Sequence, residues 1–289
     1  MTMAGTVVPV LLVAALATAT LVVPGESGNR PELASPWVAV GSARVRLLAG
    51  PPATKGSTSY LAGVEITLAE GWKTYWRTPG DAGVPPVFNW AGSANLATAG
   101  VRYPAPMRLP EPGAQTIGYK GSVLFPVEVV PADPAKAVGL KLAFEFGVCR
   151  EICIPAEATL QLDLHPALRA GEASPAILAA LTRVPRSPAE RRPQDPEIAH
   201  VSARLGEPSP GLTIAARFPG GAEGADLFVE APEGLYVPQP ARVGEGTDGT
   251  VRFEVDLGRG DAARELRGKA LTFTLVSGGG ASERTWTMP

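Results

Sequence analysis

The sequence predicts an all-β protein with two β-sandwiches in succession. Short segments in which apolar and polar residues alternate recur along the chain. Turns are expected between them, because the 289 residues include 33 Gly and 30 Pro. Alternation at every second residue is typical of a strand that buries one face, and many such strands between turns favour a sandwich. A chain of this length is expected to hold about two domains.

The first sandwich is expected over residues 30–170. Three of its segments place apolar residues at every second position: Ala62–Leu68, Leu140–Phe146 and Glu157–Leu164. Val123–Val130 is apolar on both faces, but it contains Pro126, and proline cannot donate a hydrogen bond to a neighbouring strand. We therefore expect Val123–Val130 to be an edge strand or to contain a bulge.

A short helix and a proline-rich linker are predicted over residues 171–198. Ser174 and Pro175 are the residue types favoured at an N-cap and at the first position of a helix, and the apolar stretch Ala176–Leu181 follows them. Arg186–Pro196 is polar and rich in proline. That composition is typical of a semi-rigid linker between domains.

The second sandwich is expected over residues 199–289. Its strands are predicted at Leu212–Phe218, Asp226–Glu230, Val251–Leu257, Leu271–Val276 and Arg284–Met288. This region contains no cysteine and no recognisable catalytic set of residues. We expect it to give structural support or to dock a partner.

Residues 1–28 have the pattern of a signal peptide. Val7–Val23 is an apolar run that contains small residues suited to cleavage at Ala15, Ala17 and Ala19. No Lys or Arg precedes the run, so the alternative is an uncleaved membrane anchor. We expect the protein to be exported, and no later stretch is apolar enough to cross a bilayer.

The charge pattern argues against nucleic acid as a partner. The 26 Lys and Arg residues and 28 Asp and Glu residues give a net charge of −2, and the two signs are interspersed. Binding to a phosphate backbone needs a basic patch or stripe. The sequence also has no Ser-His-Asp set, phosphate-binding loop or zinc motif, so we expect no cofactor and no metal ion.

The two cysteines of the chain, Cys149 and Cys153, stand with three residues between them. Such a pair can form a short disulfide, bind a soft metal ion or relay electrons, and disulfides persist in exported proteins. The pair follows the strand predicted at Leu140–Phe146, so no helix dipole is expected to lower a thiol pKa. Arg150 and Glu151 nearly cancel in charge, and ordinary thiol pKa values are therefore expected.

Two alternatives to a redox pair stay open. The first is a structural disulfide across a turn, although the entropy model gives so short a loop only about 1–2 kcal/mol, and a domain of this size can bury a core without it. The second is binding of Cu(I), although no Met or His lies near the pair in the sequence.

Four segments together resemble the N-terminal periplasmic domain of DsbD-type thiol:disulfide interchange proteins: Glu70–Gly83, Tyr103–Pro112, Gly118–Gly121 and Gly147–Glu157. The likeness is greatest to the ScsB-like branch, in which the cysteines have the same spacing. The resemblance covers about residues 35–165 and extends more weakly through the second predicted sandwich.

The resemblance implies an immunoglobulin-like fold for the first sandwich and a place in an electron relay. The protein would take electrons from a membrane-embedded thiol reductase and pass them to oxidised periplasmic proteins, with thioredoxin-like proteins as partners. The family's full proteins continue into a transmembrane domain and a thioredoxin-like domain, and this chain ends at Pro289 with neither. We therefore expect a separately encoded reductase, and the alternatives are a gene fragment or a relative that has lost the relay. The implied activity is that of a thiol:disulfide oxidoreductase of the protein-disulfide reductase type.

The resemblance also implies a cap loop that shields the cysteines. The matching stretch is Pro110–Tyr119, which we expect to have little regular structure and to lie over the thiols, with Tyr119 at the cap or rim. Glu157 is a candidate proton acceptor near Cys153. Four other aromatic residues are expected to pack in the core or on the sheet, with a rim around the thiols as the alternative: Trp72, Tyr75, Trp76 and Trp90.

We expect Cys149, which ends a strand, to be the better shielded cysteine, and Cys153 to attack the disulfide of a client. The competing function is a non-enzymatic periplasmic binding module, or a copper-tolerance accessory, with a structural disulfide. A redox titration separates these functions, because structural disulfides usually have potentials below about −300 mV.

Overall fold

The computed structural model describes residues 1–2, 33–52, 54, 56–111, 113–170, 174–206, 209–246, 250–258 and 262–289. The signal peptide expected at residues 1–28 therefore lies outside the described residues, apart from its first two. Within the described ranges, no helix is both long enough and apolar enough to cross a membrane. The predicted all-β class is confirmed, because the described chain forms four sheets with only short helical segments.

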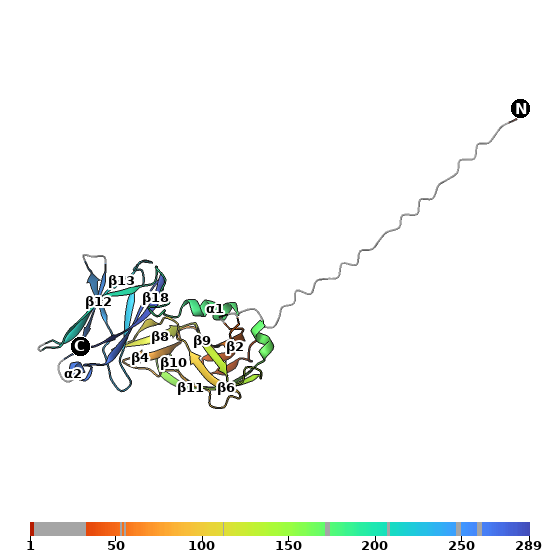
Figure 1. Cartoon of the computed structure of the whole chain (residues 1–289), viewed down its shortest axis with the longest axis horizontal. Helices are drawn as coiled ribbons and strands as arrows, with labels where there is room; N and C mark the ends of the chain where they lie inside the picture. The colour runs from red at the N-terminus through yellow and green to blue at the C-terminus, as the bar shows by residue number, and fades with distance from the viewer. Residues whose placement is uncertain are drawn as a thin grey trace. The chain divides into compact units, whose positions relative to one another are not determined.

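The first sandwich is made of a five-stranded sheet and a six-stranded sheet, and all strand pairs in both are antiparallel (Figure 1). The five-stranded sheet has the order β1 (Val38–Val40), β2 (Ala43–Gly50), β3 (Tyr60–Leu68), β9 (Ser122–Pro131) and β6 (Leu96–Val101). The six-stranded sheet has the order β11 (Cys153–Leu164), β10 (Val138–Cys149), β4 (Lys73–Gly80), β8 (Ala114–Lys120) and β7 (Met107–Glu111), with β5 (Val87–Asn89) paired to β10. Both cysteines belong to the six-stranded sheet.

The first hydrophobic core includes large aromatic side chains that are fully or almost fully buried: Trp76, Phe125, Phe144 and Phe146. Along β10 the core residues alternate with exposed ones, and the exposed ones are Lys141, Ala143 and Glu145. This alternation stops at Gly147, since every residue in 147–149 is buried. At this end of β10, therefore, the outer face of the sheet is covered as well as the inner one.

The second sandwich is made of a four-stranded sheet and a three-stranded sheet. The first has the order β12 (Glu197–Arg204), β13 (Gly211–Arg217), β16 (Val251–Asp256) and β15 (Ala241–Glu245). The second has the order β14 (Asp226–Glu230), β17 (Ala270–Ser277) and β18 (Gly280–Thr287), and a short helix α2 (Ala262–Glu265) precedes β17. The sequence predicts five of these strands and misses β12 and β15, which contain few large apolar residues.

A 3-10 helix η1 (Pro166–Ala170) and the helix α1 (Pro175–Thr182) follow the first sandwich. The helix α1 begins as predicted, with Ser174 as N-cap and Pro175 at its first position. Its residue Ile177 is fully buried in a small cluster with Leu48 and Leu61. The helix is thereby packed on the five-stranded sheet.

The sequence predicts a semi-rigid linker at Arg186–Pro196, but the structure ties this segment to β18. The backbone carbonyl of Arg186 accepts a hydrogen bond from the backbone N–H of Glu283 at 2.8 Å. The side chain of Asp195 is fully buried, and its carboxylate lies 2.7 Å from the guanidinium of Arg192. An ion pair to the buried Asp195 carboxylate and backbone pairing to β18 therefore hold this proline-rich segment in place. The division of the chain into independent domains stays a prediction.

The sequence also predicts an edge strand or a bulge at Val123–Val130, and the edge position is wrong. These residues belong to β9, which lies between β3 and β6. The carbonyl of Pro126 accepts a hydrogen bond at 2.7 Å from Arg102, just past the end of β6. In an antiparallel pair, the N–H and C=O of one residue face the same neighbour. The missing N–H of Pro126 thus faces the place where β6 has already ended.

Candidate redox site

Cys149 and Cys153 form a disulfide at the end of the β10–β11 hairpin. Cys149 is the last residue of β10 and Cys153 is the first of β11, and they stand opposite each other with Cα atoms 4.2 Å apart. Opposed residues in an antiparallel pair project from the same face. The two sulfur atoms can therefore join while the strands remain paired.

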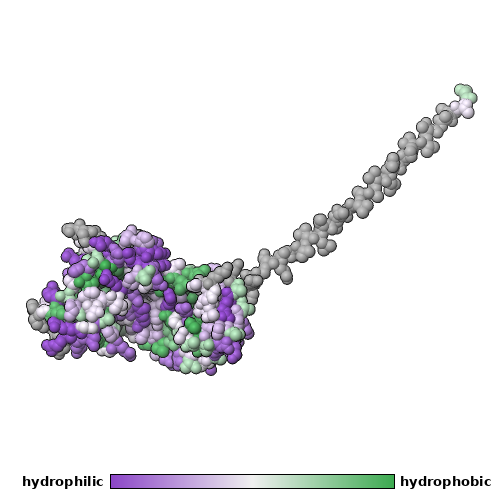
Figure 2. All heavy atoms as spheres, in the orientation of Figure 1, coloured by the Kyte–Doolittle hydropathy of each residue, from purple (hydrophilic) through white to green (hydrophobic). Residues whose placement is uncertain are grey.

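The two cysteines differ in exposure, in the direction that the sequence predicts. Cys149 is only 1% exposed, whereas Cys153 is exposed. The neighbours of Cys153 are exposed apolar residues, with Ile152 76% and Ile154 51% exposed. Hydrophilic and hydrophobic side chains are mixed on the face shown in Figure 2. A partner arriving from solvent can approach Cys153 far more easily than Cys149.

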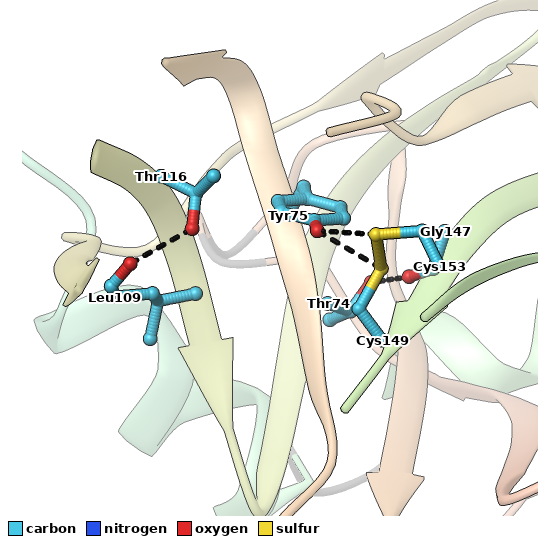
Figure 3. Close-up of a disulfide and its surroundings, with 7 residues drawn as sticks. All are labelled: Thr74, Tyr75, Leu109, Thr116, Gly147, Cys149 and Cys153. Carbon is cyan, nitrogen blue, oxygen red and sulfur yellow. Dashed lines mark hydrogen bonds between the residues drawn. A yellow bond between two sulfur atoms is a disulfide. The ribbon is translucent and has the colours of Figure 1, made fainter. Parts of the chain in front are cut away.

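Tyr75 of β4 points its hydroxyl at the disulfide (Figure 3). The hydroxyl oxygen lies 2.9 Å from the Sγ atoms of both Cys149 and Cys153, and the whole side chain is buried. Next to it, the Thr74 hydroxyl donates a hydrogen bond of 2.9 Å to the carbonyl of Gly147, which ties β4 to β10. A disulfide sulfur is a weak acceptor, but a thiolate is a strong one. The site therefore holds a buried donor that can stabilise a thiolate.

Two glycines leave the space that the ring of Tyr75 occupies. A Cβ atom on Gly83 would lie 2.6 Å from the ring atom Cε1, and one on Gly147 would lie 3.0 Å from Cδ2. A Cβ on Gly147 would also come within 3.3 Å of the Cβ of Val84. Gly83 further has a φ of +129°, which residues with a side chain rarely adopt. The segment at residues 80–84, which begins at the last residue of β4, thus covers Tyr75 and the outer face of β10 at Gly147.

The cap predicted at Pro110–Tyr119 is wrong in its structure and in its place. These residues lie mostly in β7 and β8, which pair as a hairpin. Tyr119 is opposite Thr74, so it projects from the face of the sheet that Tyr75 does not use. It is 2% exposed in the core, and its hydroxyl donates to the carbonyl of Pro104 at 2.8 Å. Burial also raises the pKa of Tyr119 well above its usual range.

Glu157 does not reach the sulfur atoms. It is an exposed residue of β11, opposite Glu145. It lies four positions along the strand from Cys153, which corresponds to roughly 13 Å. The structure therefore gives no support to Glu157 as a direct proton acceptor for Cys153.

Tyr75 is the residue of the site that the sequence prediction assigned to packing. A signal was present, because in a strand Tyr75 and Trp76 must point to opposite faces. Trp76 lies in the core, so Tyr75 had to lie on the outer face. In the sandwich predicted, that face is expected to meet solvent, and a buried tyrosine there needs a cover or a partner. What no pattern revealed is that residues 80–84 provide the cover.

Comparisons with known proteins find a family of domains to which the part of the chain with the site is similar. Residues 44–165 match the family model described as "Thiol:disulfide interchange protein DsbD, N-terminal". This range contains both cysteines, Tyr75 and the covering segment. The resemblance to DsbD-type proteins seen in the sequence is thereby confirmed for the first sandwich.

Residues 183–289 match a second family model, described as "Domain of unknown function (DUF8393)". The crystal structure of the N-terminal periplasmic domain of ScsB from Proteus mirabilis is similar to both parts together. It has 26% sequence identity and a TM-score of 0.66, and the match covers 89% of this chain and 98% of that one. No curated protein sequence matches the chain.

Proposed function

We propose that this protein is a periplasmic thiol:disulfide exchange relay that works through Cys149 and Cys153. The observation that carries the proposal is the unequal exposure of the two sulfur atoms in a domain of the DsbD type. One cysteine is accessible to a partner, and the other is buried beside a hydrogen-bond donor. This asymmetry suits an exchange reaction in which one sulfur forms the mixed disulfide and the other resolves it.

The proposed cycle begins with the oxidised protein. A thiolate of the electron donor attacks Sγ of Cys153, the bond to Cys149 breaks, and Cys149 leaves as a thiolate. The donor's second thiolate then attacks the mixed disulfide and releases Cys153. Two electrons have moved: the donor ends as a disulfide, and the pair in this protein ends as a dithiol after two protons are taken up.

The second half of the cycle passes the electrons on. The Cys153 thiolate attacks the disulfide of a client and forms a mixed disulfide, and one client sulfur leaves as a thiolate. Cys149 then attacks Cys153, which restores the Cys149–Cys153 disulfide and releases the reduced client. In the first half Cys149 is the leaving group, and leaving is faster when the thiolate is stabilised. The hydroxyl of Tyr75 is placed to do this, at 2.9 Å from Sγ of Cys149.

The partners follow from the family likeness. The donor is a membrane-embedded thiol reductase, and the clients are thioredoxin-like periplasmic proteins. Contact is made at the exposed end of the hairpin, where Ile152 and Ile154 offer apolar surface next to Cys153. The crystal structure that this chain resembles is itself of a periplasmic domain, which supports the same compartment here.

A redox titration tests the proposal. The protein is equilibrated in glutathione buffers of graded potential, and the free thiols are trapped and counted by mass spectrometry. An exchange site is expected to titrate above about −300 mV, in the range of periplasmic reductants. A lower potential, together with no transfer to an oxidised thioredoxin-like protein, would favour the alternative. In that case the chain is a binding module whose disulfide is structural, a role that a disulfide hydrogen-bonded at both sulfur atoms also suits.

A further inference from the structure

Strand β14 of the second sandwich supplies side chains to two hydrophobic cores. Leu227 and Val229 are buried in the core of the second sandwich. Phe228, between them, is fully buried in the core cluster of the first sandwich. Its ring packs against Trp76 of β4, with 5.8 Å between the ring centres. A residue of the second sandwich thus completes the packing of the strand that carries Tyr75.

The same face of β14 holds two carboxylates that bind arginines of the first sandwich. Glu230 accepts hydrogen bonds from both Nε and Nη2 of Arg77, at 2.9 and 2.6 Å, and a third from the Thr78 hydroxyl at 2.7 Å. Asp226 accepts a hydrogen bond of 2.8 Å from Nε of Arg108. Paired hydrogen bonds between guanidinium and carboxylate fix direction as well as distance. The contact of Glu230 with Arg77 and Thr78 therefore fixes the direction of β4 as well as its distance from β14.

A second carboxylate also binds Arg77. Glu283 of β18 accepts a hydrogen bond from the same guanidinium. Burial by itself would lower the pKa of Arg77, but its bonds with Glu230 and Glu283 outweigh this and raise the pKa above the ordinary value. Arg77 is therefore charged at neutral pH, and removing a single carboxylate leaves it the other as a partner.

These contacts fall where β4 is not held by its own sheet. The pairing of β4 with β8 is regular up to Tyr75 and is found again at Gly80, and the register shifts across the intervening Trp76–Pro79. The ladder of β4 and β8 thus leaves this stretch without a regular partner. It is the stretch whose side chains bind Glu230.

Another contact reaches the segment that covers Tyr75. The hydroxyl of Tyr236, in the second sandwich, donates to Oδ1 of Asp81 at 2.8 Å, and Oδ2 of Asp81 accepts from the backbone N–H of Gln115 at 2.9 Å. The hydrogen bond from Gln115, followed by that from Tyr236, lowers the pKa of Asp81 below its usual value. The carboxylate is therefore ionised at neutral pH and can accept both bonds.

We infer that the second sandwich is a positioning element of the redox site, which holds the chain between Tyr75 and Gly83 through Glu230, Glu283 and Tyr236. The inference rests on the proposed function in one respect: the proposed function makes the disulfide an exchange site. It gives the domain of unknown function a role in the site, because that domain fixes the donor hydroxyl at the sulfur atoms and keeps residues 80–84 packed on Tyr75 and Gly147.

The test compares variants of the full-length protein. Glu230→Gln, alone and together with Glu283→Gln, removes charge from the contact while keeping the shape of the side chains. Glu254→Gln is the matched control, because Glu254 is an exposed carboxylate on β16 of the same sandwich. Tyr236→Phe is a milder variant, because Tyr236 is 62% exposed and loses only its hydrogen bond to Asp81.

Two measurements are made on chemically reduced protein, so that neither depends on a partner. The first is the alkylation rate of Cys149, read by mass spectrometry, and the second is amide hydrogen exchange of residues 80–84. We expect the double variant to raise both rates roughly fivefold, the scale set by losing charge-assisted hydrogen bonds. Tyr236→Phe should raise the exchange of residues 80–84 by a smaller factor, and Glu254→Gln should match the wild type.

The outcomes separate this inference from the proposed function. Unchanged alkylation and exchange in both Glu230 variants and in Tyr236→Phe, with folding intact by circular dichroism, would overturn the positioning role. The relay would then stand if the wild type still titrates as an exchange site. Faster alkylation in a protein whose disulfide titrates as structural would support positioning and refute the relay. If the double variant does not fold, Tyr236→Phe decides.

Discussion

Strands β10 and β16 occupy comparable places in the two sandwiches but end differently. In β16 buried and exposed residues alternate along the full length of the strand. In β10 the same alternation runs to Phe146 and then gives way to three consecutive buried residues that end at Cys149. The first pattern is that of a sheet with one face in solvent. The second shows that extra structure has been added to the outer face, and here that structure is Tyr75 and residues 80–84.

The difference between the two strands indicates where a β-sandwich can hold a reactive cysteine. A strand with one solvated face leaves a cysteine on that face open to any oxidant. A strand covered on both faces shields the sulfur and can aim a donor at it. In β10 the covered stretch is short and lies at the strand end, so the partner sulfur in Cys153 remains within reach of other proteins.

The largest expected effect comes from removing either sulfur atom. Cys149→Ser and Cys153→Ser should each abolish catalytic turnover, because the cycle needs one cysteine to form the mixed disulfide and the other to resolve it. Cys149→Ser should also accumulate a mixed disulfide through the exposed Cys153, visible on non-reducing gels. If both variants kept full activity, Cys149 and Cys153 would not be the cysteines that exchange disulfides.

Filling the space beside Tyr75 should have the next largest effect. Gly83→Ala places a methyl group against the Tyr75 ring at a φ of +129°, and should cost about 2 kcal/mol or more in the free energy of unfolding. Gly100→Ala, in open space on β6, should change it by less than about 0.5 kcal/mol. Denaturant unfolding of the two variants measures the difference, and equal stabilities would show that residues 80–84 are not packed on the ring.

Two tyrosines on opposite faces of the same sheet offer a sharper test. Tyr75→Phe keeps the ring but removes the donor, so the thiolate population at neutral pH should fall roughly tenfold, the effect of one hydrogen bond to a charged group. The reduction potential should become more negative by about 30 mV for that factor. Thiolate absorbance against pH and a glutathione titration measure these two changes.

Tyr119→Phe is the control for that experiment. It loses the hydrogen bond to Pro104 and should lower the free energy of unfolding by about 1 kcal/mol. It should leave the thiols unchanged, because Tyr119 faces the core. If Tyr119→Phe altered the thiols as much as Tyr75→Phe, the two faces of the sheet would not be separate environments.

The smallest expected effect concerns Asp81. Its pKa is lowered in the folded protein by the hydrogen bonds from Gln115 and Tyr236. The stabilisation is therefore present above the unfolded value, near pH 4, and is lost as the pH falls through the lower folded value. Asp81→Asn should be less stable than the wild type at pH 7 and equal to it at the lowest pH at which both fold. A stability difference that grows on acidification would contradict this sign.

Much of the first sandwich could be predicted from the sequence, because period-two patterns such as Leu140–Phe146 depend only on one buried face. The disulfide was among the predicted options for the same local reason, since Cys149 and Cys153 flank a short turn. The cover was not predictable. The Tyr75 ring fits between residues 80–84 and β10 because Gly83 and Gly147 have no side chains. The sequence does not indicate which ring packs against a given glycine.

The sequence does not predict the contacts of Arg186–Pro196 or the inner position of β9, for a related reason. Proline content indicates the local conformational preferences of the backbone. Whether such a segment is held in the fold depends on its hydrogen bonds to strands that are distant in the sequence. Pro126 fits inside a sheet because β6 ends beside it, and Arg186–Pro196 is held by Asp195 and β18. The division into a first sandwich at residues 30–170 and a second at residues 199–289 stays a prediction, and Phe228 gives a physical reason why a fragment of residues 30–170 would lose packing at Trp76.

Strand β14 has a consequence for mutational tolerance. A strand with one solvated face can accept substitutions at every second position, which is how sandwich sequences drift while the fold persists. β14 has no such positions, since Leu227 and Val229 face one core and Phe228 and Glu230 face the other sandwich. Its substitutions must satisfy two environments at once. The two sandwiches are therefore bound to vary together at this strand, and neither can be exchanged for an unrelated domain without rebuilding the other.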